Sequence, residues 1–189
     1  MGDSIVFRAG KGAPPGPSGP LTWLGVRGAR LSALIPSIRS HLKHMPAPGT
    51  IIIHVGTNDL FSTPLKDIRR GIEEGLHTIR HLLPSVRVIW SDILLRLFYY
   101  GEAHPGVGQK SVYALNRYAH RLCRRLQGCH AISHTHIINP GQYTVYWRDG
   151  LHLSALGNKN FCENLYQGLA FFEGNVEAPL FPPSPDKPS

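Results

Sequence analysis

Two short groups of residues at opposite ends of the sequence contain the side chains that nucleophilic catalysis requires. Gly2-Asp3-Ser4 lies at the start of the chain, and Asp149-Gly150-Leu151-His152 lies towards its end. A serine hydroxyl is a weak nucleophile until a base takes its proton, and His152 could be that base for Ser4. Asp149 is close enough in sequence to accept a hydrogen bond from the second ring nitrogen of His152 and fix its tautomer. These residue types predict an acyl-transfer site.

The oxyanion that such an attack creates needs hydrogen-bond donors that are already in place, and the sequence offers three. Asn58, within Gly56-Thr57-Asn58-Asp59, has a side-chain amide. Gly28 has a backbone N–H that no Cβ obstructs, and the backbone N–H of Ser4 could be the third donor. A more ordinary interpretation stays open, because Asn58 and Asp59 are also typical turn residues after a strand.

Strand-like and helix-like segments alternate along the chain and must position these groups. Runs rich in β-branched residues predict strands, and apolar residues three and four apart predict amphipathic helices. Thr63 and Ser154 are the expected N-caps of the second and fourth helices. The alternation predicts an α/β fold with a parallel sheet, helices on both faces, and a ligand site beyond the carboxyl ends of the strands. The expected strands are residues 21–26, 50–55, 86–95 and 131–138, and the expected helices are residues 31–43, 64–83, 109–126 and 154–172.

The order of these groups resembles the SGNH (GDSL) hydrolase superfamily. Gly-Asp-Ser, a glycine block, Gly-Thr-Asn-Asp and Asp-x-x-His follow one another over residues 2–152. The stretches IIIHVGTNDL and DGLHLSALGNKNF are similar to uncharacterised vertebrate and retroelement-type SGNH-like esterase domains. The resemblance implies a three-layer α/β/α sandwich with a parallel, flavodoxin-like sheet and a serine hydrolase activity on esters. The site residues that it implies are the nucleophile Ser4, the triad partners Asp149 and His152, and the oxyanion-hole donors Ser4, Gly28 and Asn58.

The start of the chain departs from the pattern of that superfamily. A strand leads into Gly-Asp-Ser in the superfamily, whereas only Met1 precedes Gly2 here, so the first strand is missing. A nucleophile at a strand-to-helix turn is held by what comes before it, and we therefore expect Ser4 to lie at a mobile terminus. We also expect that the gene product begins further upstream, and that the activity of residues 1–189 depends on whether this turn forms.

Composition and cysteine content limit the other classes of protein that this chain could be. Hydrophobic residues make up 42% of its 189 residues, which is enough for an ordinary core. The longest purely aliphatic run is residues 51–53, far short of the ~18–20 apolar residues of a membrane span. Cys123, Cys129 and Cys162 fit neither a disulfide framework nor a zinc ribbon, and the absence of a secretory signal favours a cytoplasmic protein. We expect no metal and no cofactor.

The expected organisation is one hydrolase-like domain over residues 1–176 and a disordered, Pro-rich tail over residues 177–189. Its expected function is hydrolysis of a carboxylic ester with a short acyl or acetyl group. The substrate would be a small-molecule, lipid or carbohydrate ester. Residues 98–100 (Phe-Tyr-Tyr) follow a strand and could line an acyl pocket or simply pack on the core.

The alternative function is that of a catalytically degenerate relative that acts in binding. Ser4 would then be an ordinary N-terminal serine, and His152 would only precede a helix. The net charge of +8 makes nucleic acid the partner class to consider, but no nucleic-acid-binding motif supports it. The sequence leaves the oligomeric state open.

Overall fold

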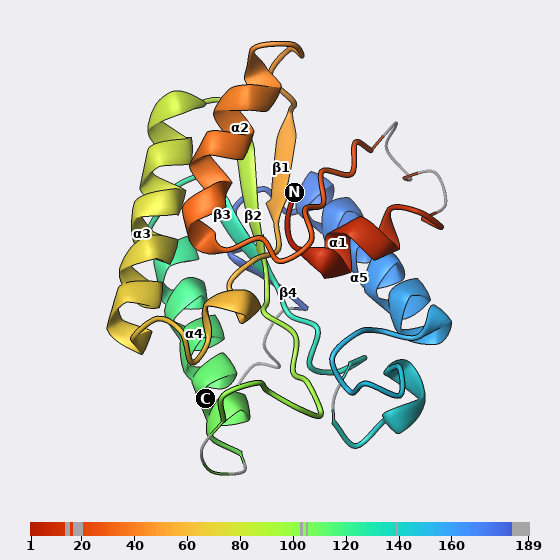
Figure 1. Cartoon of the computed structure of the whole chain (residues 1–189). Helices are drawn as coiled ribbons and strands as arrows, with labels where there is room; N and C mark the ends of the chain where they lie inside the picture. Colours follow the sequence, from red (N-terminus) through yellow and green to blue (C-terminus); the bar gives the residue numbers. More distant parts are fainter. Residues whose placement is uncertain (14–15, 17–20, 103, 105, 139, 183–189) are drawn as a thin grey trace, which may run out of the picture.

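A parallel β-sheet lies at the centre of the computed structural model, which describes residues 1–13, 16, 21–102, 104, 106–138 and 140–182 (Figure 1). The strands stand in the order β1, β2, β3, β4, and each is parallel to its neighbour. Because all run in one direction, their carboxyl ends share one edge of the sheet. The predicted α/β class is confirmed. The strand bounds are β1 Thr50–Ile53, β2 Arg87–Ser91, β3 Cys129–Ile132 and β4 Leu180–Phe181.

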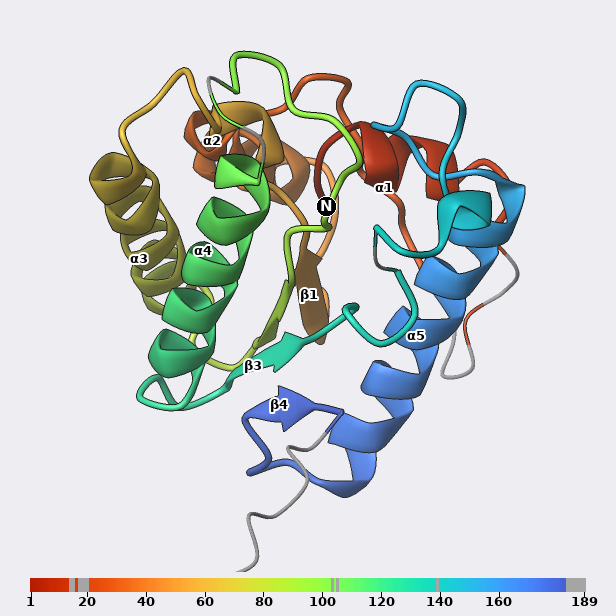
Figure 2. The ribbon, with the colours of Figure 1, turned by 90° about the horizontal axis from the view of Figure 1, so that it is seen from below.

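Helices cover both faces of this sheet and complete a three-layer sandwich (Figure 2). One face is covered by α2 (Leu34–Leu42), α3 (Leu65–Leu82) and α4 (Val107–Cys123). The other face is covered by α1 (Ser4–Ala9) and α5 (Ala155–Gly174). Each face therefore has its own apolar core, and the sheet separates the two.

The predicted helix over residues 64–83 shows why the apolar spacing is informative. Ile68, Ile72, Leu76 and Ile79 lie on one face of α3 and are at most 1% exposed. The prediction that Thr63 caps this helix is wrong, because the residue before α3 is proline and no side chain accepts a hydrogen bond there. The cap predicted for the last helix is confirmed, since the Ser154 hydroxyl accepts from the N–H of Gly157 at 3.1 Å.

The predicted strand over residues 21–26 is wrong. This segment is irregular, and its contact with the sheet is a bridge between Gly25 and Gly2. Gly2 N–H donates to the carbonyl of Leu24 at 2.9 Å, and Val26 N–H donates to the carbonyl of Gly2 at 2.9 Å. The apolar residues of the segment therefore follow the sheet without forming a continuous ladder.

Met1 and Gly2 lie along β1, in the place of the first strand that was predicted to be missing. The amino group of Met1 donates to Ile52 O at 2.8 Å, and His54 N–H donates to Met1 O at 3.0 Å. Gly2 fits because an added Cβ would lie 2.1 Å from His54 O. Ser4 thus follows a two-residue remnant of a strand that is hydrogen-bonded on both sides. We expected Ser4 to lie at a mobile terminus, whereas in the structure the residues before it are anchored by these hydrogen bonds.

Three predicted strands end earlier than expected, and the predicted tail starts with an ordered segment. The strand predicted over residues 50–55 is β1, which ends at Ile53. The strand predicted over residues 86–95 stops at Ser91, because the N–H and C=O of Ile93 bond to the Asn116 side chain instead of to a neighbouring strand. The strand predicted over residues 131–138 is β3, which starts two residues earlier and ends at Ile132. β4 lies inside the expected tail, where its apolar Leu-Phe pair adds to the edge of β3. Residues 183–189 of that tail lie outside the described part of the chain.

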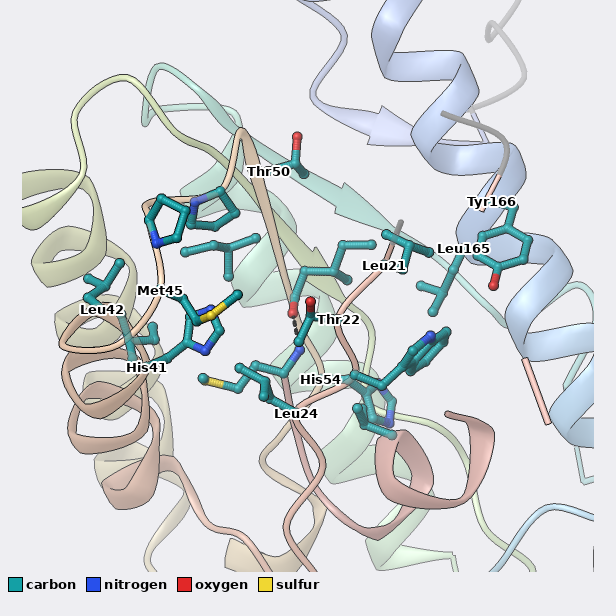
Figure 3. A pocket seen from close by; sticks show the side chains of 18 of the residues that line it. Leu21, Thr22, Leu24, His41, Leu42, Met45, Thr50, His54, Leu165 and Tyr166 are labelled. Atoms are coloured by element: carbon teal, nitrogen blue, oxygen red, sulfur yellow. Dashed lines mark hydrogen bonds between the residues drawn. The ribbon is translucent and has the colours of Figure 1, made fainter. Parts of the chain in front are cut away.

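An apolar cavity of about 230 Å³ lies beside β1, next to Met1 (Figure 3). Leu24, Leu42, Met45 and Leu165 are among the side chains that surround it. It runs along β1 from Thr50 to His54, and its lining does not include Ser4, Asn58, Asp149 or His152. The cavity is therefore separate from the candidate site. Among the helices described here, none has the length and apolar character needed to cross a membrane.

Candidate active site

The start of α1 and the loop before α5 lie along the same edge of the molecule, the upper edge in Figure 2. Ser4 is the first residue of α1 and is half-buried. Asp3 caps this helix, because its Oδ1 accepts from the N–H of Ile5 at 2.9 Å. The N–H groups of a first helical turn have no acceptor within the helix, so the Ser4 N–H stays available.

Asp149 and His152 form a hydrogen-bonded pair. His152 Nδ1 donates to Asp149 Oδ2 at 2.8 Å, and the N–H groups of Leu151 and His152 donate to Asp149 Oδ1 at 2.9 and 3.0 Å. Burial acts to raise the pKa of Asp149, but the hydrogen bonds from His152 and Leu151 outweigh it and lower this pKa to about 2. Asp149 is therefore a carboxylate near neutral pH, and it leaves the Nε2 of His152 as the nitrogen that can take up a proton.

The loop that carries this pair is held in a defined shape. Gly150 adopts a positive φ of 64°, and a Cβ there would lie 3.0 Å from the Cβ of Leu97. Leu97 N–H donates to Gly150 O at 2.9 Å, which attaches the loop to the segment that follows β2. Trp147 N–H donates to His152 O at 2.8 Å and closes the turn. The Asp149–His152 pair is thus presented on a turn that only glycine fits easily.

The structure joins Asn58 to the turn that contains Gly28. Asn58 Nδ2 donates one hydrogen to the carbonyl of Ala29 at 3.0 Å, which leaves the second amide hydrogen free to bind another acceptor. Gly28 has a φ of 70°, and an added Cβ would meet nothing within 4 Å. Asp59 has a structural contact, since its Oδ2 accepts from Leu31 N–H at 3.1 Å. Asn58 and Gly28 are therefore neighbours. Asp59 holds the backbone at Leu31, three residues after Gly28.

Ser4 and His152 are not hydrogen-bonded to each other in the part of the chain that the structure describes. Their neighbourhoods are nevertheless close, because α1 packs against α5 and the charges of Asp3 and Asp149 both act on Arg96. In unliganded enzymes the hydrogen bond between nucleophile and base is often long and shortens when substrate binds. The arrangement therefore allows serine chemistry, with the final contact between Ser4 and His152 left to the bound state.

A buried polar network beneath this edge was not anticipated from the sequence. Asn164 Nδ2 donates to His134 Nδ1 at 2.8 Å, so the other nitrogen of His134 donates to Ser91 Oγ at 2.7 Å. The Ser91 hydroxyl then donates to His54 Nδ1 at 3.0 Å. Ser91 is 0% exposed, so this second Ser–His contact cannot meet a substrate and its role is structural. Its members come from four segments far apart in the sequence, and no local sequence pattern shows that they meet. His54 follows β1, Ser91 ends β2, His134 follows β3 and Asn164 lies in α5.

Burial lowers the pKa of both histidines in this network, His54 and His134. Between these lowered values and about pH 6.5 the unfolded chain binds more protons than the folded chain. The free energy of unfolding is therefore expected to fall as the pH drops below about 6.5, by up to ~1.4 kcal/mol per pH unit for each histidine. Urea unfolding at pH 7.5, 6.0 and 5.0 measures this dependence.

Two variants separate the network from the other histidines. His134→Gln should reduce the pH dependence of the unfolding free energy by the contribution of one histidine. His77→Gln changes an exposed residue of α3 and should keep the dependence of the parent protein. Equal unfolding free energies at pH 7.5 and pH 5.0 in the parent protein would contradict the assignment of two buried neutral histidines.

Other chemistry-bearing groups in the described residues do not form a second centre. No cluster of three or more His, Cys, Asp or Glu side chains in these residues could hold a metal ion. Cys123, Cys129 and Cys162 are free and buried, and burial raises the pKa of each thiol. They are therefore poor nucleophiles, and the chemistry of the site depends on the groups around Ser4.

The fold is similar to those of several solved structures at low sequence identity. A protein from Streptococcus pneumonia described as a platelet activating factor aligns with a TM-score of 0.70 at 21% identity, over 89% of this chain and 81% of its own. The psychrotrophic esterase EstA from a Pseudoalteromonas species aligns with a TM-score of 0.64 at 13% identity, over 82% and 79%. A carbohydrate esterase of family 3 from Talaromyces cellulolyticus aligns with a TM-score of 0.64 at 16% identity, over 93% and 97%.

A comparison with curated proteins found no match to this sequence. The sequence model of one family matches residues 1–159, which include Ser4, Asn58 and the whole of the Asp149–His152 segment. The structural likenesses agree with the α/β/α architecture of the SGNH superfamily. The chain belongs to the GDSL-like Lipase/Acylhydrolase family.

Proposed function

We propose that this protein is a serine esterase that hydrolyses a carboxylic ester with a short acyl group, such as acetyl. The observation that carries the proposal is the Asp149–His152 pair, joined at 2.8 Å and placed at the same edge of a GDSL-family fold as Ser4. The solved structures with a similar fold include a carbohydrate esterase and an acetyl esterase, which supports a small acyl group. Small-molecule or carbohydrate esters are the substrate class that we favour.

In the first half of the proposed reaction, Ser4 Oγ attacks the carbonyl carbon of the ester. The proton of the hydroxyl passes to Nε2 of His152, and Asp149 stabilises the resulting imidazolium through Nδ1. The carbonyl oxygen becomes an oxyanion that accepts hydrogen bonds from the Ser4 N–H, the Gly28 N–H and the Asn58 amide. The carbon–oxygen bond to the alcohol then breaks, and the alcohol oxygen takes the proton from His152. An acyl group remains on Ser4.

In the second half, water takes the place of the alcohol. His152 removes a proton from the water, the resulting hydroxide attacks the acyl carbon, and the same donors hold the second oxyanion. Ser4 leaves with the proton from His152, and the carboxylic acid is released. Each step uses protein groups alone, so the proposal requires neither metal nor cofactor.

Asn58→Ala should lower kcat by roughly 10²- to 10³-fold, as expected for the loss of one oxyanion donor. The hydrogen bond to Ala29 O is lost as well, so a melting curve must show that the variant is folded. Kinetics with p-nitrophenyl acetate measure the effect. An unchanged kcat in a folded variant would remove Asn58 from the oxyanion hole.

Hydrolysis of p-nitrophenyl acetate, butyrate and octanoate by residues 1–189 tests the proposed function. Turnover that is fastest for acetate or butyrate and that disappears in Ser4→Ala is the expected result. Absence of turnover, or turnover of equal rate in Ser4→Ala, would contradict it. The three chain lengths also define the size of the acyl pocket.

A further inference from the structure

The segment that follows β2, residues 92–97, is held by side chains and backbone from three other parts of the fold. The Asn116 amide clamps Ile93 through bonds of 3.0 and 2.9 Å to its N–H and C=O. The Tyr146 hydroxyl donates to Leu95 O at 3.1 Å. Leu97 N–H donates to Gly150 O at 2.9 Å, inside the turn that carries Asp149 and His152. A segment with this many anchors has a fixed backbone beside the candidate site.

Arg96 lies in this segment, and its backbone is fixed too. Its N–H donates to the hydroxyl of Tyr99 at 2.9 Å, and Tyr99 is only 4% exposed. Tyr99 was one of three aromatic residues considered for an acyl pocket, and its burial shows that it packs on the core instead. Phe98 and Tyr100 are 50% and 73% exposed and do not enclose a pocket by themselves. Arg96 is half-buried and is the one basic side chain of residues 92–97.

Arg96 is half-buried, and its guanidinium pairs with neither of the two carboxylates whose charges act on it. Asp3 and Asp149 lie near enough for their charges to act on it. In the described part of the chain, however, no carboxylate oxygen lies within 4.0 Å of its nitrogens, and no acceptor forms a hydrogen bond with its guanidinium. Other arginines of the protein are paired, for example Arg70 with Asp67 at 2.9 Å.

Neither neighbouring carboxylate is placed to satisfy Arg96. Both oxygens of Asp149 already accept hydrogen bonds from Leu151 and His152. Asp3 Oδ1 accepts from the N–H of Ile5, and its Oδ2 is buried with no hydrogen-bond partner, so neither oxygen bonds to Arg96. Burial acts to lower the pKa of Arg96, and Asp3, Tyr99 and Asp149 act to raise it. A guanidinium stays charged in proteins, so a partly desolvated cation without a partner remains at the site.

Three exposed arginines surround the same edge. Arg27 precedes Gly28, Arg30 follows the turn that binds Asn58, and Arg148 precedes Asp149. Arg27 lies 4.8 Å from the ring centroid of Phe7, and no ion pair holds any of the three within the described residues. Their summed potential favours the approach of an anion to the site.

We propose that Arg96 binds a carboxylate of the substrate, so that the ester which this enzyme hydrolyses is anionic. The inference rests on the proposed function and narrows its substrate class. The planar fork of a guanidinium matches a carboxylate in two parallel hydrogen bonds. A single half-buried guanidinium fits a single negative charge better than a phosphate dianion. The carboxylate can belong to the acid part or to the alcohol part of the ester.

Two pairs of esters, each matched in shape and different in charge, test this proposal and distinguish the two sources of the carboxylate. For the acid part, 4-nitrophenyl hydrogen adipate is compared with 4-nitrophenyl methyl adipate. For the alcohol part, 4-acetoxybenzoate is compared with methyl 4-acetoxybenzoate. The expected result is a kcat/KM at least about tenfold higher for the anionic member of one pair, the range of a charged hydrogen bond.

Variants of Arg96 assign that preference to its side chain. Arg96→Gln should bring the ratio of kcat/KM for anionic over neutral ester to about one, and Arg96→Lys, which keeps the charge but not the fork, should give an intermediate ratio. Arg124→Gln changes an exposed arginine at the end of α4, remote from the site, and should keep the parent ratio and rates. Melting curves show whether the variants are folded.

The outcomes separate this inference from the proposed function. If the parent protein hydrolyses the neutral esters through Ser4 but shows no preference for the anionic member of either pair, the carboxylate subsite is contradicted and the esterase stands. A ratio of kcat/KM for anionic over neutral ester that is unchanged in Arg96→Gln would likewise contradict the carboxylate subsite and leave the esterase standing. If the parent protein hydrolyses no ester, both the esterase and the subsite are contradicted. If Arg96→Gln fails to fold, Arg96→Lys decides the question, because an unchanged ratio in that variant would contradict a role for the guanidinium fork.

Discussion

Replacing Ser4 by alanine should abolish ester hydrolysis, with a fall in kcat of roughly 10³-fold or more against p-nitrophenyl acetate. The hydroxyl is the only part of Ser4 that the substitution removes, and the backbone N–H that would bind the oxyanion stays. Any residual rate would come from the donors at Gly28, Asn58 and the Ser4 backbone. Initial rates with equal amounts of folded parent and variant protein measure the effect.

A second serine variant provides the control for this measurement. Ser85 is exposed between α3 and β2, at the opposite end of the sheet from Ser4. Ser85→Ala should hydrolyse p-nitrophenyl acetate at the parent rate. A Ser4→Ala protein that keeps more than about a tenth of the parent rate would show that another group is the nucleophile, and the proposed role of Ser4 would then be wrong.

Replacing His152 by glutamine should cost about as much as replacing Ser4, again roughly 10³-fold or more in kcat. Without an imidazole, no group at this edge can take the Ser4 proton and return it to the leaving alcohol. Because both residues act in one proton transfer, the Ser4→Ala/His152→Gln double variant should be no slower than either single variant. The additive result, a fall equal to the product of the two single effects, would contradict a shared step.

The matched control for His152 is His81, which is exposed on α3 far from the loop before α5. His81→Gln should keep the parent kcat and KM. A His152→Gln variant that raised KM but kept kcat would indicate that His152 only binds substrate. The kcat and KM values must therefore be determined separately, with p-nitrophenyl acetate as the common substrate.

Some parts of the fold follow from patterns that are local in the sequence. The run TIIIHV is β-branched and bounded by glycine, and it forms β1 and the buried residues after it. The apolar residues of α3 repeat at helical spacing, and Ser154 caps α5 through its own hydroxyl. Each signal lies within a few residues of the structure it specifies, and therefore a single sequence is sufficient to predict it.

Other parts depend on contacts between segments that are far apart in the sequence. Residues 21–26 have the apolar composition of a strand, but the β-bridge they form is with Gly2, and they stay irregular because the strand beside them has two residues. Asp149 and His152 could be paired from their spacing, whereas the anchoring of residues 92–97 requires Asn116, Tyr146 and Gly150 to meet one segment. The site is therefore predictable in its residue types and less so in its supports.

The central claim, that Ser4 is an activated nucleophile, is tested most directly by covalent labelling. A fluorophosphonate reacts with an activated serine hydroxyl and leaves a stable adduct that intact-protein and peptide mass spectrometry can locate. The account predicts one adduct per chain, on the peptide that contains Ser4, and no adduct in Ser4→Ala or His152→Gln. Labelling of another residue, or no labelling of a folded protein that hydrolyses p-nitrophenyl acetate, would contradict it.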